Sequence, residues 1–287
     1  MMSLPSNSLS SMNNNKPISK VLIIDGVAVE TKWMIQQRME KFRQGLHDTM
    51  SLSPFLIPIL FDLHHADNFS DLAELLMAGH LMIGHFTSFG KLIDEKILPK
   101  VFNTFKLSGK YRESNPPLAL SCFNEIDHLV PRGNKFALLS LKASRWTINL
   151  SVAKELNSAF SIILRDYIEL YNEIVVGVFN GTLEGLTDKY DILRGINRGK
   201  THDVLDIQTN VKVVAGRDFW SWLNFGETQT QDWVLEGILK GLKQANCREE
   251  SRTLLRAYIS AFNERYAKHI KADGSIDWQQ LLAEING

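Results

Sequence analysis

Asp127, Ser140 and Lys142 have side-chain types and a spacing that suit hydrolysis of a phosphate ester. Residues 131–134 (PRGN) lie between Asp127 and the other two, and this turn signal predicts a hairpin of two strands. Residues two apart on a strand share a face, so Ser140 and Lys142 point the same way and the hairpin brings Asp127 to them. A lysine in so apolar a strand needs a partner, and Asp127 needs one for the same reason.

Hydrolysis of a phosphodiester requires a divalent metal that binds a phosphate oxygen and lowers the pKa of a bound water. Mg²⁺ takes oxygen ligands, usually one or two carboxylates with several waters. Asp127 and the Leu141 carbonyl are the candidate metal ligands, and Lys142 orients the water or neutralises developing negative charge. Ser140 occupies the position where a second carboxylate is expected.

Two acids are candidates for the missing carboxylate. Glu95 is the first, on a helix predicted just before the hairpin, and Glu125 is the alternative on the strand of Asp127. Simpler interpretations stay open. Asp127 and Lys142 would form a structural ion pair between two strands, and residues 94–96 would be a solvated helix face.

The elements that must position these residues form an α/β pattern. A long helix is expected from about residue 25 to residue 50. Residues 71–82 are predicted as a helix with Ser70 as N-cap, followed by a loop at 84–90 and a helix at 91–105. Strands are expected at 122–130, 135–143, 173–180 and 211–215, a helix at 147–167, and helices from residue 217 onward. The fold class is therefore a central mixed β-sheet flanked by helices.

Composition limits the function classes. Lys plus Arg and Asp plus Glu both number 32, so the chain carries no net charge and is not a bulk polycation that packs nucleic acid. Basic side chains nevertheless predominate over residues 96–145, and we expect them to line one groove. No apolar stretch reaches the roughly 18 residues of a membrane helix, and we expect residues 1–20, which have no apolar run, not to act as a secretory signal. With only two cysteines, a cytoplasmic location is expected.

Beyond the short motif, the chain resembles a known enzyme family. Asp127 with residues 140–142 is similar to the PD-(D/E)xK nuclease motif, with Ser in the acidic position. Longer runs resemble the type II restriction endonucleases that cut Pu-G-G-N-C-C-Py, and they cover most of residues 50–245: 53–55, 80–102, 122–128, 138–150, 174–181, 185–197 and 219–224.

The resemblance implies a Mg²⁺-dependent endonuclease of a restriction-modification system that leaves 5′-phosphate and 3′-hydroxyl ends. It implies a homodimer on double-stranded DNA and a cognate DNA methyltransferase that is not a stable subunit. It assigns the metal role to Asp127 and the lysine role to Lys142. We expect a disordered leader at 1–20, a nuclease core at 71–216, and a helical dimerisation region formed by 21–70 and 217–287.

Arginine is the natural reader of guanine in the major groove, and lysine and arginine contact phosphates. Arg145, directly after the catalytic strand, is the first candidate for contacting DNA. The loop from Lys189 to His202 is the second, and a solvated polar loop is the simpler interpretation of it. The full set of candidates is Arg145, Lys189, Arg194, Arg198, Lys200, His202, Lys110 and Arg112.

Two other functions fit the same residues. One is a repair or junction nuclease built on the same core, which would need a lesion or a branch in its substrate. The other is a non-catalytic DNA-binding protein with a degenerate nuclease site, which Ser140 in the acidic position keeps open.

Overall fold

A computed structural model describes residues 16–45, 53 and 55–286. The described residues divide into two compact units. One takes the residues up to Glu30 together with Lys91–Lys240, and the other takes Thr31–Gly90 together with those from Gly241 onward. Most of the predicted leader, residues 1–15, lies outside the described residues. At its end, the backbone N–H of Ile18 donates to Oδ1 of Asn224 at 2.7 Å.

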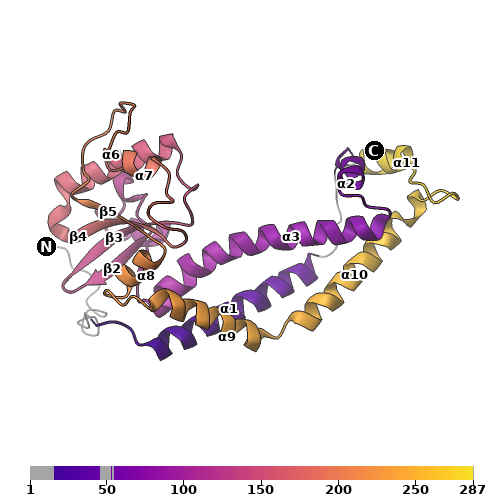
Figure 1. The fold of residues 1–287 in the computed structure, drawn as a ribbon, viewed down its shortest axis with the longest axis horizontal. Helices are drawn as coiled ribbons and strands as arrows, with labels where there is room; N and C mark the ends of the chain where they lie inside the picture. Colours follow the sequence, from indigo (N-terminus) through magenta and orange to yellow (C-terminus); the bar gives the residue numbers. More distant parts are fainter. Residues whose placement is uncertain (1–15, 46–52, 54, 287) are drawn as a thin grey trace. The chain divides into compact units, whose positions relative to one another are not determined.

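Helices begin the described chain, strands and helices alternate in its middle, and helices end it (Figure 1). The helices, including short 3₁₀ and π segments, are α1 (Lys20–Gln44), α2 (Leu56–Leu63), α3 (Phe69–Lys91), the π-helix η3 (Leu92–Ile97), α4 (Leu98–Val101), α5 (Gly109–Glu113), η4 (Ser121–Phe123), α6 (Leu150–Asp166), η5 (Ile168–Leu170), α7 (Lys189–Ile192), α8 (Arg217–Leu223), α9 (Thr230–Ala245), α10 (Arg248–Tyr266), η6 (Ala267–His269) and α11 (Trp278–Asn286). The strands are β1 (Phe105–Lys106), β2 (His128–Arg132), β3 (Lys135–Lys142), β4 (Tyr171–Val178) and β5 (Val211–Ala215).

One five-stranded sheet organises the first unit, in the order β1-β2-β3-β4-β5. The pairs β1–β2 and β2–β3 are antiparallel, whereas β3–β4 and β4–β5 are parallel. Helix α6 provides the crossover between the parallel strands β3 and β4, as parallel neighbours require. The prediction of an α/β chain with a mixed sheet flanked by helices is confirmed in this coarse form.

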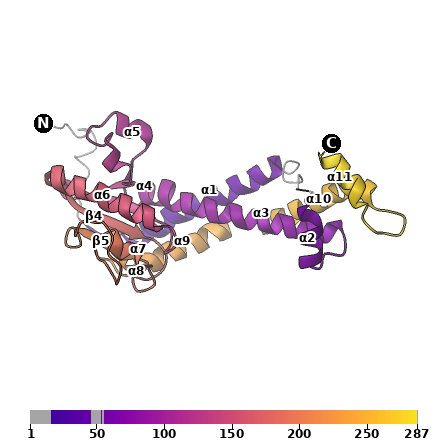
Figure 2. The ribbon, with the colours of Figure 1, turned by 90° about the horizontal axis from the view of Figure 1, so that it is seen from above.

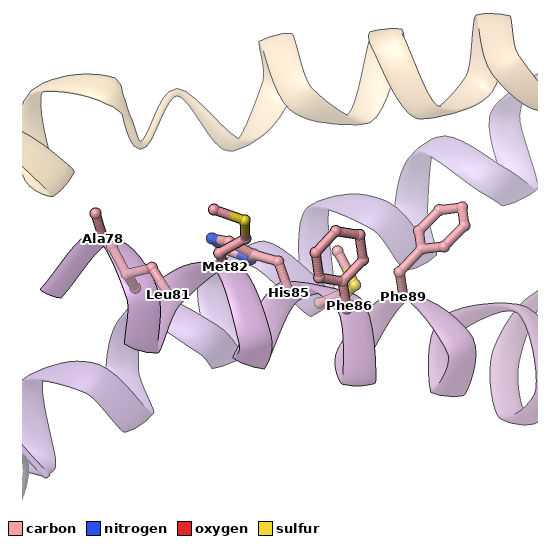
Figure 3. Close-up of a pocket in the computed structure, with 7 residues that line it drawn as sticks. Ala78, Leu81, Met82, His85, Phe86 and Phe89 are labelled. Carbon is pink, nitrogen blue, oxygen red and sulfur yellow. The ribbon is translucent and has the colours of Figure 1, made fainter. Parts of the chain in front are cut away.

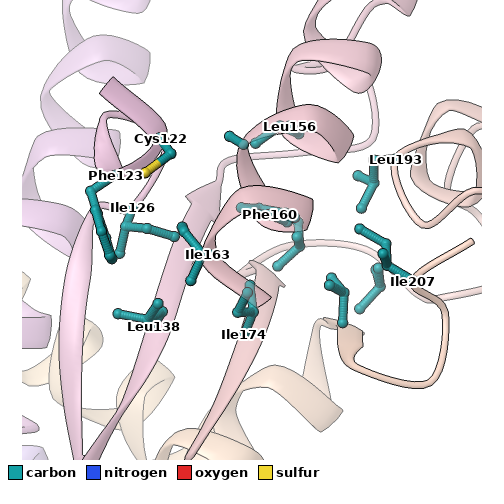
Figure 4. Close-up of a cluster of buried hydrophobic side chains, with 14 of the residues drawn as sticks. Cys122, Phe123, Ile126, Leu138, Leu156, Phe160, Ile163, Ile174, Leu193 and Ile207 are labelled. Atoms are coloured by element: carbon teal, nitrogen blue, oxygen red, sulfur yellow. The ribbon is translucent and has the colours of Figure 1, made fainter. Parts of the chain in front are cut away.

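The two faces of the sheet bury different helices. Figure 2 shows helix α6 beside the strands of the sheet. On that face, Leu138 and Ile174 belong to a core that also holds Phe160 and Ile163 of α6 (Figure 4). On the other face, a β-carbon added to Gly177 would lie 2.5 Å from the ring of Phe219 in α8. Because strands β3 and β4 are covered on both faces, their apolar runs are nearly continuous.

The hairpin forms as predicted, but its first strand is shorter. The pairs run from His128 with Leu139 to Arg132 with Lys135, and a two-residue turn begins at Gly133, where φ is 63°. The predicted strand over 122–130 is wrong in its first half, where η4 and a turn precede β2. Cys122 and Phe123 are apolar because they fill the core beneath α6, which needs no strand geometry.

The second unit has a helical core rich in aromatic side chains. Phe69 of α3 stacks on Tyr266 of α10 with ring centroids 5.4 Å apart, and its centroid lies 6.2 Å from that of Phe262. The predicted loop at 84–90 is wrong, because α3 runs unbroken from Phe69 to Lys91. The guanidinium of Arg38 from α1 lies against Gly84, since a β-carbon there would lie 1.7 Å from its Nη2. Packing therefore overrides the weak helix propensity of the Gly/Thr/Ser segment.

The start of α3 also differs from the prediction. Ser70 is not the N-cap. Instead Oδ1 of Asn68 accepts the N–H groups of Ser70 and Asp71, at 2.9 and 3.1 Å. The two units also differ in their boundaries from the predicted domains. Residues 71–90, predicted in the core, belong to the helical unit, and residues 217–240, predicted in the helical region, belong to the unit with the sheet. Among the described helices, none is both long and apolar enough to cross a membrane.

Candidate active site

Asp127 is held in an extended conformation at the start of β2. Its N–H donates to the Leu139 carbonyl at 2.8 Å, and its carbonyl accepts from the N–H of Leu107 at 2.9 Å. Its carboxylate oxygen Oδ2 accepts from the N–H of Leu141 at 2.7 Å. The Asp127 carboxylate is thus hydrogen-bonded to the 140–142 segment, as the sequence pattern predicted.

Asp127, Ser140 and Lys142 belong to the same face of the sheet. The register of the hairpin, continued by one residue, places Asp127 opposite Ser140, and Lys142 follows two residues later. The Ser140 hydroxyl is fully buried, and no described residue forms a hydrogen bond with it. Lys142 is half-buried, and its ammonium group has no hydrogen bond or ion pair within the described part of the chain. The structure therefore brings an acid and an available lysine to one place.

These residues lie at the edge where the parallel strands end. The N–H of Phe179, after β4, donates to the Lys142 carbonyl at 3.3 Å, and the N–H of Gly216, after β5, donates to the Val178 carbonyl at 2.9 Å. In open α/β sheets, ligands bind outside the carboxyl ends of the strands. The position in the fold and the residue types therefore make this edge a candidate site.

Arg112 supports the turn that leads into Asp127. Its guanidinium donates to the carbonyls of Phe123 and Ile126. Burial lowers the pKa of Arg112, while the negative charges of Asp127 and Glu125 act in the opposite direction. Arg112 was expected to contact DNA, and the structure instead gives two of its donors to backbone oxygens. Glu125 is half-buried, and its charge acts on the same guanidinium as that of Asp127.

A buried network lies on the opposite face, beside Asp127 in sequence. His128 is fully buried, its Nε2 is 2.7 Å from Oδ1 of Asp94, and its Nδ1 is 3.0 Å from the Thr104 hydroxyl. A carboxylate only accepts, so Nε2 carries the proton that Asp94 accepts. Lys106 donates to the other oxygen of Asp94. Although burial opposes the shift, these hydrogen bonds lower the pKa of Asp94.

This network decides where Glu95 lies. Asp94 in η3 reaches the sheet through His128, and successive residues of a strand point to opposite faces, so η3 covers the face away from the Asp127 carboxylate. Glu95 is exposed, and no hydrogen bond joins it to Asp127 in the described structure. The π-helical turn presents Asp94, and not Glu95, to the sheet. The sequence had favoured Glu95 as the second carboxylate, with a solvated helix face at 94–96 as the simpler interpretation.

Replacing Asp94 by Asn should lower the free energy of unfolding by about 1–3 kcal/mol at pH 7, because His128 and Lys106 lose a charged acceptor. The folded-state pKa of Asp94 lies below its ordinary value of 3.8, so its stabilisation is complete above that pH and is lost as the pH falls further. Urea unfolding at pH 7 and thermal melting down to the lowest pH at which the protein folds measure both effects.

Glu95→Gln on the same helix is the matched control, and its stability should equal that of the wild type. Equal stability of the wild type and Asp94→Asn at pH 7 would show that the network contributes nothing to the fold.

Two of the segments expected to bind DNA meet beside α7. The Tyr190 hydroxyl donates to the Ser144 carbonyl at 2.9 Å, which ties α7 to the turn that carries Arg145. Asn157 of α6 donates to the carbonyls of Leu193 and Leu205, at 3.1 and 2.8 Å, and so anchors both ends of the loop between them.

The basic side chains of these segments differ in their partners. Several are neutralised locally: Arg194 and Arg198 both pair with Asp191, at 3.0 and 2.7 Å, and Lys189 pairs with Asp188 at 2.5 Å. Others have no ion pair among the described residues, namely Arg145, Lys110, Lys200 and His202. Arg145, Lys110 and Lys200 are exposed and His202 is half-buried, so these four remain open to a phosphate or a base.

The expectation that all basic residues of 96–145 line one groove is wrong. Lys135 and Lys142 begin and end the eight-residue strand β3, so seven residue steps separate their Cα atoms by about 23 Å. Arg132 lies at the turn end with Lys135, where its guanidinium donates to the Trp222 carbonyl at 2.7 Å and stacks on that ring at 4.6 Å. The hairpin separates the cluster, because it carries its turn to the edge opposite Asp127.

The residues at this site could hold a Mg²⁺ ion only through few protein ligands. Among the described residues, no three His, Cys, Asp or Glu side chains gather as a metal-holding group. Mg²⁺ in phosphoryl-transfer sites is held by one or two carboxylates with substrate oxygens and waters. One carboxylate on a strand edge, with a buried unpartnered hydroxyl opposite it, meets that lower requirement.

Some residues of the site escaped sequence reasoning. His128 could have been found from the sequence, since a histidine inside an apolar strand needs hydrogen-bond partners when it is buried. Tyr190 and Thr104 left no such signal, because each acts through a contact with a segment far away in the chain. No protein-family model matches the chain, and no curated protein matches it significantly.

Proposed function

We propose that this chain is a type II restriction endonuclease, a Mg²⁺-dependent enzyme that cuts double-stranded DNA at Pu-G-G-N-C-C-Py. One observation carries the proposal: Oδ2 of Asp127 lies 2.7 Å from the Leu141 nitrogen, so the acid of the nuclease-like motif is joined to its Ser140–Lys142 part. The sequence runs that resemble this enzyme family support the target and the products, a 5′-phosphate and a 3′-hydroxyl.

Each residue of the motif has a role that its position supports. Asp127 would hold the metal through its other carboxylate oxygen, with the Leu141 carbonyl and Glu125 as further ligand candidates. A bound Mg²⁺ supplies a water of lowered pKa and neutralises charge on the phosphate. Lys142, whose ammonium group has no partner in the described structure, donates to the attacking water or to a phosphate oxygen. Ser140 contributes no charge, so the second carboxylate comes from Glu125, because η3 holds Glu95 on the other face of the sheet.

DNA would be held at the edge where the parallel strands end. Arg145 follows Lys142 by three residues, and Tyr190 ties the start of the loop from Lys189 to His202 to the Ser144 carbonyl. Lys110 lies on α5, two residues before Arg112, whose charge interacts with that of Asp127. The basic side chains among them that have no ion pair would contact phosphates, so the affinity for DNA should fall as the salt concentration rises. Arg194 and Arg198 would have to break their ion pairs with Asp191 before they could contact bases.

The enzyme would act as a homodimer, since a palindromic target is matched by a twofold pair of identical subunits. The second unit offers a surface for this role. Met82, Ile83 and Phe86 of α3 are 56, 71 and 74% exposed. Met82 and Phe86 line an apolar hollow of about 530 Å³, together with Met34, Ala78, Leu81, His85 and Phe89 (Figure 3). We propose that a second copy of the chain covers this surface, because contiguous exposed apolar side chains mark interfaces. A cognate methyltransferase would act separately.

Phe86→Glu should convert the protein from a particle of twice 32.6 kDa to one of 32.6 kDa, because the buried charge would cost more than the interface supplies. Light scattering on a size-exclusion column measures the mass. Ile59→Glu, a similar change at a 56% exposed residue of α2, should leave the dimer intact. A wild type that elutes as a monomer at all concentrations would exclude this assembly.

Digestion of a plasmid of known sequence with Mg²⁺ tests the enzymatic proposal. Discrete fragments whose ends map to Pu-G-G-N-C-C-Py sites are the expected result. Cutting only at a lesion or a branched junction would identify a repair or junction nuclease. A gel shift of duplex DNA in Ca²⁺ without cleavage in Mg²⁺ would favour a non-catalytic DNA-binding protein, the outcome that the uncharged Ser140 position supports.

A further inference from the structure

An exposed tryptophan follows the strand of Lys142. Trp146 is 73% exposed, and the guanidinium carbon of its neighbour Arg145 lies 4.7 Å from the centroid of its ring. The pair begins three residues after Lys142, at the edge of the sheet where the carboxylate of Asp127 lies. A cation over an indole face is an attractive pair that leaves the other face of the ring for a ligand.

The turn that carries this pair is fixed by buried groups. The Ser144 carbonyl accepts from the Thr147 hydroxyl at 2.6 Å and from the Tyr190 hydroxyl at 2.9 Å. Tyr190 is 3% exposed, and burial raises the pKa of its hydroxyl, which therefore keeps its proton. Ile148 is buried directly after the turn. The exposure of Trp146 is therefore set by anchored neighbours on both sides.

The exposed indole of Trp146, in a fixed turn close to the proposed catalytic Lys142, suits a planar ligand. A nucleobase has an aromatic face whatever its identity, and stacking on a protein aromatic ring is sequence-tolerant. Arg145 adds a positive charge that no carboxylate in the described structure neutralises through an ion pair. The platform therefore combines the two features with which proteins hold single nucleotides of a strand: an aromatic face and a cation for the phosphate.

We propose that Trp146, supported by Arg145, inserts beside the cleaved phosphate and stacks on a base that it separates from its neighbour. This inference rests on the proposed function, since the ligand is the duplex that Asp127 and Lys142 would cut. In a duplex the bases cover one another, so an indole gains a face only by opening a step, as apolar wedges in other DNA-binding proteins do. Local unstacking at the cleavage site is the consequence.

Fluorescence of 2-aminopurine reports unstacking directly. Duplexes that contain one Pu-G-G-N-C-C-Py site, with 2-aminopurine placed in turn at the positions flanking it, are titrated with protein in Ca²⁺. We expect a rise in fluorescence with the wild type and with Trp146→Phe, and none with Trp146→Ala. Affinity for the duplex should fall roughly 5- to 150-fold in Trp146→Ala. Phe55→Ala, at an aromatic residue 68% exposed in the other unit, is the control and should match the wild type.

The outcomes separate this inference from the proposed function. If the wild type binds and cuts DNA while Trp146→Ala shows unchanged affinity and the same fluorescence rise, the wedge is overturned and the nuclease stands. If the wild type binds duplex without cutting, the fluorescence comparison still decides the role of Trp146. If the folded wild type binds no duplex at all, both proposals fail. Circular dichroism and thermal melting show that each variant folds.

Discussion

Asp127→Asn should cut plasmid DNA on the order of 10³-fold more slowly than the wild type, because metal-ion charge stabilisation is worth several kcal/mol and Asp127 is the carboxylate of the site. Asn is preferable to Ala here. Its side-chain oxygen can still accept the hydrogen bond from the Leu141 nitrogen, so the strand edge keeps its geometry while the charge is lost. Conversion of supercoiled plasmid in Mg²⁺ measures the rate.

DNA binding by Asp127→Asn should persist in Ca²⁺, since the cations that hold phosphates are unchanged. Asp127→Ala should lose cleavage to the same degree, and comparison of its thermal stability with that of Asp127→Asn isolates the contribution of the hydrogen bond. Asp62→Asn, at an exposed carboxylate of α2, is the control and should cut at the wild-type rate. Wild-type cleavage by Asp127→Asn would show that the acid is structural and that the site assignment is wrong.

Lys142→Ala should reduce the cleavage rate roughly 10²- to 10³-fold, the usual loss when one preorganised donor to a developing negative charge is removed. Its ammonium group has no ion pair or hydrogen bond among the described residues, so little folding energy depends on it. The loss should therefore appear in the single-turnover rate at saturating protein, with a thermal melting temperature close to that of the wild type.

Lys135→Ala is the matched control on the same strand. Lys135 begins β3 and Lys142 ends it, about 23 Å away, so the control removes the same charge from the same strand at the opposite edge. It should cut at the wild-type rate. Equal losses in the two variants would mean that Lys142 contributes only general positive charge, and an unaffected Lys142→Ala would remove the residue from the mechanism.

The local pattern was sufficient for the hairpin and the buried strands. The turn at 131–134 and the apolar run at 174–179 lie close to the observed β2–β3 turn and to β4, because both signals act between neighbours in the chain. The predicted helix at 147–167 and strand at 211–215 correspond to α6 and β5. The pairing of Asp127 with residues 140–142 followed from the hairpin alone, since its register depends on the turn.

The failures share one physical cause. Residue propensity predicts a loop at 84–90, yet α3 continues through it, and the side chain of Arg38 from α1 lies against Gly84. Cys122 and Phe123 read as strand residues, yet they are buried in a 3₁₀ turn under α6. In each case, contacts with residues far away in the chain outweigh a local preference of a few tenths of a kcal/mol to about 1 kcal/mol.

The sequence by itself determined which residues are available for chemistry, the sheet strands that carry them, and the hairpin that joins Asp127 to Lys142. Only the tertiary structure decided which neighbours those residues have. It placed Asp94 and His128 on the face away from the Asp127 carboxylate, moved Arg132 and Lys135 to the far edge, and gave Arg112 to backbone carbonyls. The physical reason is that residue types and spacing act through the chain, whereas the face and edge that a side chain occupies depend on strands and helices that meet only when the chain folds.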